Sequence, residues 1–585
     1  MTIHNFWLKQ SKLIDWHKKP TIAFKKKNNN FVEWYPDGEV NIFHNCVTKN
    51  LKLNLGKKIA IYFVNENKEI QNYTYEELDK KVNNFSQIIL RNIKKKKVSN
   101  TKVIIHSSAS IEATIAMLTC AKLGIHFSVI FEDLAPEAIS KRIALLKPNI
   151  FISRFDKNKF EREVSSKFET KKNIKYIFFD NQKNLKNFKN TKKISTKGFP
   201  SGKELFTLFT SGSTGVPKGI VHASGGYLVA TKFTSMSQFG MNQNSIVVTA
   251  SDAGWLNGHT YALFGPLSLG ATTVLIQKPI MLLDEKLLKK ILNLKVTILY
   301  LPVTLIRMMK SIFNKTKFQT KDLITLGSMG EHIAPSVAEW FAEHFTKKEN
   351  SIVNAYYQTE NGAIISSPTH KEKIYQSPHG SAGKPSSKFI KTNKLLKIKK
   401  KEMKILTPWP GNMKRIINGN KEWKKYWDSK GNFRMFDLAT KKKGNIFIHG
   451  RVDDVINIRG HRIGSEEIES VTLKIKEIFE CCAISIEDNI EGHIIFLFVV
   501  AKEEELDQII FKNIMSNFGA FALPKKVYYI NELPKTRSGK ILRRLLRSIL
   551  LDPYSHSHTD LTMMLNKKVY NDIKKKIINE HKNSN

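Results

Sequence analysis

Glu204–His222, ELFTLFTSGSTGVPKGIVH, joins a short apolar run to a loop rich in glycine and hydroxyl side chains. The apolar run predicts a buried strand, and the loop has the composition of a phosphate-binding loop. Its glycines let backbone N–H groups approach an anion, its hydroxyls can donate hydrogen bonds, and Lys218 adds a positive charge. It is not a Walker A loop, which needs Gly-Lys-Ser/Thr where this chain has Pro217-Lys218-Gly219. A flexible Gly/Ser linker is the competing interpretation, but linkers rarely follow a buried strand directly.

The chain around this stretch alternates strand-like and helix-like segments, which predicts a wound, mostly parallel α/β sheet. Before the loop, the expected strands are Lys58–Phe63, Val103–Ile105 and Phe127–Ile130, and the expected helices are Tyr75–Arg91 and Ile111–Leu123. Beyond residue 453 a smaller α+β unit is expected, with helices at Ser465–Leu473, Glu505–Ser516 and Lys540–Leu551 and a strand at Ile494–Ala501. The predicted domains are therefore residues 1–452 and 453–585. Residues 1–40, which include Trp7, Trp16 and Trp34, are expected to wrap the surface of the larger domain.

Four more motifs follow the loop in order: AYYQTE at Ala355–Glu360, Phe436-Asp437, GRVDD at Gly450–Asp454, and PKTRSGK at Pro534–Lys540. Together with the loop they resemble the signatures of adenylate-forming enzymes, which activate a carboxylic acid with ATP and pass the acyl group to a thiol. The segment SDAGWLNGHTY at Ser251–Tyr261 is similar to the acetyl- and propionyl-CoA synthetase branch of that family. The resemblance covers nearly the whole chain. It implies an AMP-forming acid–thiol ligase that uses ATP, Mg²⁺ and coenzyme A, in which a small C-terminal domain rotates about a hinge.

The resemblance also implies a nucleotide site. A carboxylate and ATP are both negative, so the site must supply positive charge and N–H dipoles around the phosphates. Asp437 is expected to accept hydrogen bonds from the ribose hydroxyls, and Glu360 to hold Mg²⁺. An ordinary surface carboxylate is the alternative for Glu360, and a hinge ion pair is the alternative for Arg451. The residues expected to bind ATP or AMP are Thr210, Ser211, Gly212, Ser213, Thr214, Lys218, Gly330, Glu331, His332, Asn354, Ala355, Tyr356, Tyr357, Gln358, Thr359, Asp437, Arg451 and Arg462.

Lys540 is the predicted catalytic residue, because in the family the lysine of this motif bridges the substrate carboxylate and the α-phosphate. Adenylation and thiolysis need different groups in the same place, and rotation of the small domain would exchange them. Asp453 is the predicted pivot, and His461 and Arg462 lie on the segment that it swings. Neutralising Lys540 would remove a charge that adenylation needs, so a deacylase or acyltransferase acting on Lys540 is an expected partner.

The predicted acyl pocket consists of Trp255, Leu256, Asn257, Met329 and Tyr357. By the resemblance, Leu256, Asn257, Met329 and Tyr357 occupy the positions at which the acetate enzymes have Val, Thr, Val and Trp. Tyrosine is smaller than tryptophan while leucine and methionine are larger than valine, so the pocket still suits a short acid. Acetate is the first expectation. Since Asn257 adds a donor and an acceptor, and one methylene is worth only ~1–3 kcal/mol, propionate, acrylate, 3-hydroxypropionate and acetoacetate remain alternatives.

The residues expected to bind coenzyme A are Lys159, Arg162, Asn257, Arg459 and Gly460. This side departs from the family: Glu132-Asp133 replaces a Gly-Gly turn, Met515 replaces an arginine, and Ile280 replaces an asparagine. An acidic pair near a polyanion counts against the usual mode of binding. Another thiol acceptor, such as the phosphopantetheine of a carrier protein, is therefore an alternative. Ile475 replaces a histidine associated with a structural Mg²⁺, so no second metal site is expected.

The composition is strongly basic, with 95 Lys+Arg against 52 Asp+Glu and a net charge of +43. The lysines are scattered in runs among asparagine and isoleucine, which indicates a compositional bias on solvated faces; no specific nucleic-acid binding is expected. The cysteines Cys46, Cys120, Cys481 and Cys482 fit a reducing compartment, and Cys481 and Cys482 are expected on opposite faces of a strand. Because no apolar run is long enough to span a bilayer, a cytoplasmic protein without membrane insertion is expected. The oligomeric state stays open.

Overall fold

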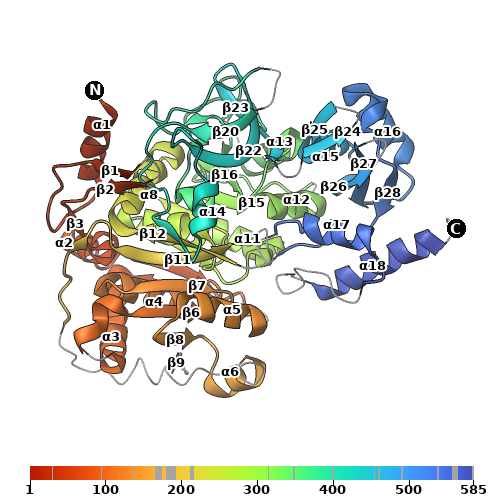
Figure 1. The fold of residues 1–585 in the computed structure, drawn as a ribbon. Helices are drawn as coiled ribbons and strands as arrows, with labels where there is room; N and C mark the ends of the chain where they lie inside the picture. The colour runs from red at the N-terminus through yellow and green to blue at the C-terminus, as the bar shows by residue number, and fades with distance from the viewer. Residues whose placement is uncertain are drawn as a thin grey trace.

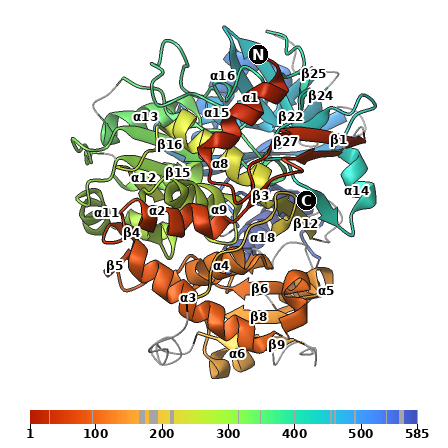
Figure 2. The same ribbon diagram turned by 90° about the vertical axis from the view of Figure 1, so that its left-hand side faces the viewer.

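The computed structural model describes residues 1–585 except 29–30, 94, 135, 165–173, 180–192, 211–216, 314, 347–348, 398–400, 453–454, 459–460, 489–491, 537–538, 556–563, 565 and 583–585. Its larger part holds two sheets with helices around them, and a smaller part at the C-terminal end packs against one side (Figure 1). Viewed from the side, the two sheets of the larger part lie one above the other (Figure 2).

Each large sheet has seven strands among the described residues. The first has the order β21 (Arg415–Ile417), β12 (Lys218–Ala223), β11 (Glu204–Thr210), β7 (His126–Ile130), β6 (Lys102–His106), β8 (Ile150–Ser153), β9 (Lys175–Phe178). The second has the order β17 (Val353–Asn354), β16 (Thr325–Met329), β15 (Ile298–Pro302), β13 (Ile246–Thr249), β14 (Thr272–Ile276), β4 (Ile59–Val64), β5 (Ile70–Thr74). Pairing is parallel except at β11–β12, β12–β21 and β4–β5, so the mostly parallel sheet expected from the sequence is confirmed.

Helices connect the strands, and their ends follow from local chemistry. In α4 (Ile111–Leu123) the Ser110 hydroxyl accepts from the Ala113 N–H at the start, and Gly124 closes the end with φ 66°. Every residue of α4 except Glu112 is buried, as its apolar sequence predicts. The other main helices are α3 (Tyr75–Asn92), α5 (Pro136–Leu146), α6 (Lys157–Glu163), α8 (Ser224–Phe239), α11 (Glu285–Leu292), α12 (Val303–Ile312) and α13 (Pro335–Phe345).

The N-terminal segment does more than wrap the surface. In α1 (Ile3–Gln10) Trp7 is fully buried, and its ring lies 5.9, 5.5 and 5.4 Å from those of Trp34, Phe233 and Trp409. The segment is thus anchored in the main apolar core. Residues 180–192 lie outside the described residues, and the segment that follows them forms a short strand, β10 (Phe199–Pro200), paired with β3 (Glu39–Val40).

A three-stranded antiparallel sheet follows the larger sheets, with strands β20 (Lys401–Ile405), β22 (Phe433–Lys442) and β23 (Asn445–Arg451). A short helix, α14 (Asn420–Lys425), precedes β22. This sheet carries Asp437 and Arg451 on neighbouring strands, directly paired in register.

The smaller part contains β24 (Val455–Ile458), β25 (His461–Gly464), α15 (Ser465–Thr472), β26 (Ile478–Asp488), β27 (Gly492–Ala501), α16 (Asp507–Phe518), β28 (Lys526–Tyr529), α17 (Arg543–Leu551) and α18 (Lys567–Lys582). The expected helix from Lys540 begins only at Arg543, because Lys535 and Ile541 form a β-bridge that holds the preceding residues in a loop. Cys481 and Cys482 lie on opposite faces of β26, in two different apolar clusters, as predicted. An apolar cluster crosses from the large part to the small one and includes Val303 and Ile306 of α12 with Ile456 and Ile468.

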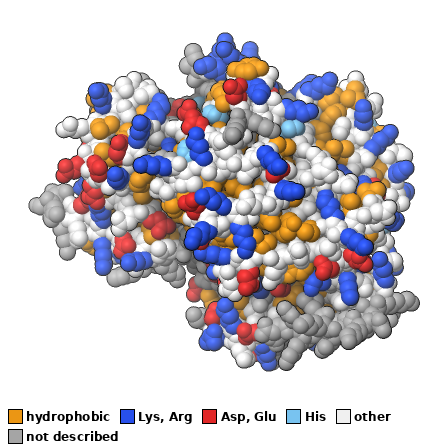
Figure 3. Space-filling view, turned by 180° about the vertical axis from the view of Figure 1, so that it is seen from behind, with side chains coloured by type: hydrophobic (Ala, Val, Ile, Leu, Met, Phe, Trp, Pro, Cys, Tyr) orange, Lys and Arg blue, Asp and Glu red, His pale blue; other side chains and the backbone are white. Residues whose placement is uncertain are grey.

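Lysine and arginine side chains are spread over the visible face in Figure 3 and are mixed with aspartate and glutamate. Within the described part of the chain, no helix combines the length and apolar character needed to span a bilayer.

Candidate active site

The phosphate-loop flanks are strands β11 and β12. Thr210 and Lys218 are register partners, so the two ends of the loop are held side by side. The loop residues Ser211, Gly212, Ser213 and Thr214 lie outside the described residues. Glu204, at the start of β11, binds Arg415 of β21 through both oxygens at 2.7 and 2.8 Å and lies 3.1 Å from His126 of β7. Although burial alone would raise the pKa of Glu204, its contacts with His126 and Arg415 hold that pKa far below its usual value. These contacts connect β11 with β21 and β7 at the end of β11 opposite Thr210.

Lys218 and Glu360 share a neighbour, Tyr426. The Lys218 ammonium lies 5.7 Å from the centre of the Tyr426 ring and 3.3 Å from a carboxylate oxygen of Glu422. The Tyr426 hydroxyl donates to Glu360 at 2.6 Å. Burial, followed by the Glu360 charge, raises the pKa of Tyr426, which keeps the hydroxyl a donor. A predicted phosphate-binding cation and the predicted Mg²⁺ ligand thus lie around one aromatic ring.

Asp437 is the centre of a buried hydrogen-bond cluster. It accepts from the Tyr356 hydroxyl at 2.6 Å and from the Gln358 amide at 2.7 Å, while Arg451 Nη1 lies 3.3 Å from its other oxygen. Gln358 also donates to the Met435 carbonyl at 2.6 Å. Burial raises the pKa of Asp437 and outweighs the opposing effect of Arg451. The cluster brings three predicted nucleotide-binding residues onto the predicted ribose-binding carboxylate.

The segment after β16 provides the predicted adenine side. Gly330 has φ 94°, and a side-chain carbon placed on it would meet nothing within 4 Å, so the space beside it is open. Glu331 forms an ion pair with Arg307 at 2.7 Å. Burial, with His449 and Arg307 nearby, lowers the pKa of His332 to about 4, which leaves the imidazole neutral at pH 7.

Backbone and side-chain contacts hold the segment from Asn354 to Thr359 in place. Asn354 in β17 accepts from the Ser328 hydroxyl at 3.1 Å, and the Ala355 N–H donates to the Ser328 carbonyl at 3.0 Å. The Thr359 carbonyl contacts His222 Nε2 of β12 at 2.7 Å, which ties the motif to the strand behind the phosphate loop.

The predicted acyl residues gather at the carboxyl ends of the second sheet. Tyr357 donates its hydroxyl to the Asn257 carboxamide oxygen, and its ring stands edge-on to Tyr261 at 5.7 Å. Leu256 and Met329 are buried. Trp255 instead lies against Phe131, 5.2 Å between ring centres, on the side that faces the first sheet.

The predicted coenzyme A residues are less well assembled among the described residues. Lys159 lies over the Phe155 ring at 3.9 Å, Arg162 is 3.1 Å from Glu163, and both are on α6. Arg459 and Gly460 lie outside the described residues. The acidic turn is compensated: Glu132 forms an ion pair with Arg154 at 3.0 Å. Arg154 was not predicted from the sequence. Its position directly after β8 was the available signal, because Glu132 follows the end of the parallel strand β7 in the same sheet.

Lys540 is exposed and lies on a loop at the edge of the small part. Its N–H donates to the Thr536 hydroxyl at 3.1 Å. Gly539 has φ 82°, and a side chain there would collide with Thr304 at the start of α12. The lysine motif therefore lies beside the carboxyl end of β15. Asp453 is outside the described residues, as is the side chain of Arg462.

Comparison with known proteins gives the family. The AMP-binding enzyme family matches residues 52–410, the AMP-binding enzyme C-terminal domain matches 467–540, and the acetyl-coenzyme A synthetase N-terminus matches 2–46. This chain belongs to the AMP-binding enzymes. Acetyl-coenzyme A synthetase from Leptospira biflexa serovar Patoc is 31% identical over 597 residues, covering 93% of this chain and 89% of that protein. Acetyl-coenzyme A synthetase from Aeromonas salmonicida is 32% identical over 593 residues, covering 93% and 90%.

Solved structures show the fold of this AMP-binding enzyme. Acetoacetyl-CoA synthetase from Streptomyces lividans has a TM-score of 0.81 at 16% identity, covering 99% of this chain and 93% of that one. The anthranilate CoA ligase AuaEII, solved in complex with anthranoyl-AMP, has a TM-score of 0.75 at 19% identity, covering 87% and 97%. The two-part α/β fold of adenylate-forming enzymes is thereby confirmed.

A metal site of three or more His, Cys, Asp or Glu side chains is not found among the described residues of this AMP-binding enzyme. A single carboxylate still fits Mg²⁺ in a nucleotide site, because this ion keeps several waters and binds through one or two carboxylates together with substrate phosphates. Glu360, held by the hydroxyl of Tyr426, whose ring lies 5.7 Å from the Lys218 ammonium, has this character.

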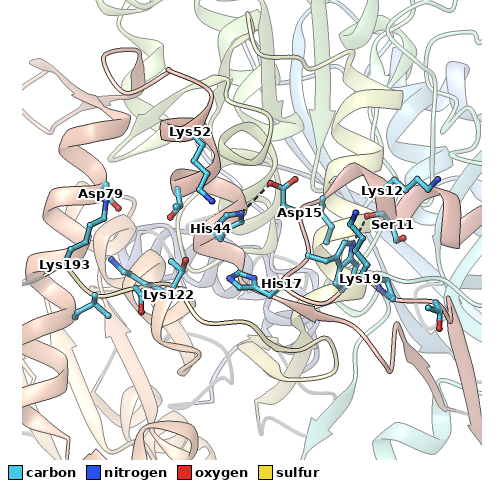
Figure 4. A pocket seen from close by; sticks show the side chains of 18 of the residues that line it. Ser11, Lys12, Asp15, His17, Lys19, His44, Lys52, Asp79, Lys122 and Lys193 are labelled. Carbon is cyan, nitrogen blue, oxygen red and sulfur yellow. Dashed lines mark hydrogen bonds and ion pairs between the residues drawn. The ribbon is translucent and has the colours of Figure 1, made fainter.

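A large cavity lies away from all of these residues. It measures about 1380 Å³ and is bordered by the N-terminal segment, η2 (His44–Thr48) and the end of α4. Lys12, Lys19, Lys52, Lys122 and Lys193 line it, with Asp15 and His44 in contact at 3.5 Å (Figure 4). None of the predicted site residues that the structure describes borders this cavity, so its size alone does not mark the site of the chemistry.

Proposed function

We propose that this chain converts acetate, ATP and coenzyme A into acetyl-CoA, AMP and diphosphate through an acyl-adenylate. An AMP-forming acid–CoA ligase activity with ATP, Mg²⁺ and coenzyme A follows from its family and its relatives. The observation that supports the site assignment is that two clusters lie against one ring, Phe436, whose centre is 5.3 Å from that of the Tyr426 ring and 5.6 Å from the Arg451 guanidinium carbon. One is Asp437 with Tyr356, Gln358 and Arg451, and the other is Lys218 and Glu360 around Tyr426.

In the first half-reaction, a carboxylate oxygen of the acid attacks the α-phosphorus of ATP and diphosphate leaves. Asp437 accepts the ribose hydroxyls, as an ionised carboxylate can. Lys218 and the loop N–H groups compensate the charge of the leaving diphosphate. Glu360 would hold Mg²⁺, which when bound neutralises phosphate charge. Lys540 brings its ammonium to the oxygens between acid and α-phosphate.

In the second half-reaction, the thiolate of coenzyme A attacks the acyl carbonyl carbon and AMP leaves. Residues 1–452 form the nucleotide- and acid-binding domain in this proposal, and residues 453–585 form the domain that carries Lys540. Rotation about Asp453 withdraws Lys540 and admits the thiol. Arg462, Arg459 and Gly460 then approach the substrates, while Lys159 and Arg162 take the nucleotide end of coenzyme A.

A substituted acid is the second candidate, and one observation favours it. The floor of the acyl cluster is polar, because the Tyr357 hydroxyl meets the Asn257 carboxamide. Next to them lies the fully buried Tyr300 hydroxyl, which interacts with the Tyr357 hydroxyl. A site with several buried polar groups favours a substrate that supplies a hydrogen-bonding group, such as a hydroxy or oxo group.

The exposure of Lys540 supports a regulatory proposal as well. Acylation of its ammonium would remove the charge that adenylation uses, and a deacylase would restore it. Mass spectrometry of the protein from cells under acetate stress tests this. A Lys540 that stays unmodified under those conditions would contradict the proposal.

The test of function is acid-dependent diphosphate release, with and without coenzyme A. The acids compared are acetate, propionate, acrylate, 3-hydroxypropionate and acetoacetate. Acetate is expected to give the fastest turnover, with repeated cycles only when coenzyme A is present. Lys540→Ala is expected to abolish release, whereas Lys525→Ala, in the small part, serves as the control for losing a lysine.

Each alternative has its own result in this assay. Fastest turnover on 3-hydroxypropionate or acetoacetate would favour the second candidate and contradict acetate. An adenylate that forms but is not discharged by coenzyme A would contradict the proposed acceptor and point to a carrier-protein thiol.

A further inference from the structure

Arg307 in α12 is a buried cation that faces carboxylates from both parts of the molecule. Its Nη2 lies 2.7 Å from Oε1 of Glu331, in the large part. Burial alone would lower the pKa of Arg307, but the charges of Glu331, Glu480 and Glu469 outweigh burial and raise it. Glu480 and Glu469 belong to the small part, on β26 and α15, and α12 packs directly against β26. Arg307 therefore forms an ion pair with a carboxylate of the large part and is influenced by the charges of two carboxylates in the small part, against which its helix packs.

Each of the two small-part carboxylates also binds a cation beside the lysine motif. Glu480 forms an ion pair with Lys535 at 2.6 Å, and both side chains are buried. Glu469 binds Arg543 through both oxygens, at 2.8 and 2.7 Å. Lys535 is the second residue of the Pro534–Lys540 motif, and Arg543 follows the motif by three residues. The two ion pairs thus hold the motif at both ends.

The same helix touches the motif a second time. Gly539, next to Lys540, lies so close to Thr304 in the first turn of α12 that no side chain would fit there. Thr304 and Arg307 are three residues apart and so lie on one face of the helix. That face presents both a backbone contact and a charge to the small part.

We propose that Arg307 is a positioning residue that holds the lysine motif at the carboxyl edge of the second sheet during adenylation, through Glu480 and Lys535. The inference rests on the proposed acid-activating function. Removing Arg307 would leave Glu331 without its cation and would leave Glu480 and Glu469 with one cation each, Lys535 and Arg543, which disfavours this arrangement of the two parts.

The charges around Arg307 favour the arrangement in which the small part packs against α12, but they still allow the small part to move away. Among the described residues, Arg307 Nε and Glu480 Oε2 have no hydrogen-bond partner. Such incompletely satisfied charges gain less from contact than a fully paired network does. Glu331 would remain as the partner of Arg307 when the small part moves away, and Lys535 as the partner of Glu480.

The experiment separates the two half-reactions in the full-length chain. Adenylation is measured by acid-dependent exchange of pyrophosphate into ATP, and thiolysis by discharge of preformed acyl-adenylate with coenzyme A. Arg307→Met is expected to lower kcat for adenylation by about 100-fold, since small misplacements of catalytic groups have effects of that size. The KM for the acid and the thiolysis rate are expected to change less than about threefold, because neither needs the motif at this edge.

Two further variants complete the design. Arg307→Lys keeps the charge and is expected to recover part of the adenylation rate. Lys526→Met removes an ion pair with Glu580 (2.6 Å) inside the small part and is expected to leave both half-reactions unchanged. If Arg307→Met does not fold, Arg307→Lys tests the proposal instead. It is expected to show a smaller decrease in the adenylation rate and no change in the thiolysis rate.

Wild-type adenylation in Arg307→Met would overturn the proposal. Equal losses in both half-reactions, with a lower unfolding midpoint, would overturn it too, because they would make Arg307 a purely structural residue. A wild-type chain without acid-dependent exchange would refute the proposed function itself, and the role of Arg307 with it.

Discussion

Replacing Asp252 by asparagine is expected to change how stability depends on pH. Asp252 follows β13, and its Oδ1 accepts from the Gly254 N–H at 2.9 Å. Burial, with added repulsion from Glu132, raises the pKa of this carboxyl to about 7 from an ordinary value of 3.8. The asparagine keeps an oxygen that can accept from Gly254 and removes only the ionisation.

The direction in which stability changes with pH follows from the number of protons that the folded and unfolded chains bind. Between pH 3.8 and about 7 the folded chain holds a proton on Asp252 that the unfolded chain has lost, so stability falls as pH rises through this range. A pKa difference of about three units corresponds to roughly 4 kcal/mol once the pH exceeds both pKa values, and to about 1.5 kcal/mol at pH 5. Asp252→Asn is therefore expected to gain about 2 to 3 kcal/mol over wild type between pH 5 and pH 8.

Urea unfolding at pH 5, 6.5 and 8 measures this gain as the difference between variant and wild-type midpoints multiplied by the slope. Asp572→Asn, at an exposed position on α18, is the matched control for losing a carboxylate. A variant-minus-wild-type difference that stays constant across this pH range would refute the reasoning.

Two other substitutions test features of the fold and site. Trp7→Ala is expected to lower the unfolding free energy by about 3–5 kcal/mol, because it leaves a cavity at a fully buried site. Trp423→Ala, on the partly exposed helix α14, is the control and is expected to lower it less. Equal unfolding midpoints for the two variants would contradict the anchoring role of α1. Tyr426→Phe removes the donor to Glu360 and is expected to raise the Mg²⁺ concentration for half-maximal adenylation by about 10–100-fold. The exposed Tyr554→Phe is its control, and an unchanged Mg²⁺ requirement in Tyr426→Phe would count against Glu360 as the metal ligand.

Local signals predicted much of the fold. The strand expected directly before the phosphate loop is β11, and the helix expected at Ile111–Leu123 has those bounds because its start and stop residues lie next to it in sequence. The helix expected from Lys540 starts at Arg543, because a β-bridge across the lysine loop competes with helix formation there. Sequence periodicity does not report such a pairing.

Contacts between distant residues were beyond sequence reasoning. Arg154 compensates Glu132, and Tyr426 holds Glu360, although no motif includes either partner. Arg307 lies more than a hundred residues before Glu480 and is one of many basic residues in the chain. Which of the 95 basic side chains are buried and paired depends on how the two parts pack, and the spacing of charges in the sequence does not encode that.

The apolar cluster shared by α12 and residues 456–527 has a consequence for synthesis in the cell. A ribosome releases the chain from its N-terminus, so the larger part can assemble before its apolar partners have been made. At a synthesis rate of about 5–20 residues per second, the segment from residue 453 to 527 takes roughly 4–15 s to be made. During that time the cluster that includes Val303 and Ile306 lacks its partners from the small part and is open to association with other nascent chains. A chain stopped at residue 452 would keep that face permanently, so we expect it to depend on chaperones and to aggregate where the full chain does not.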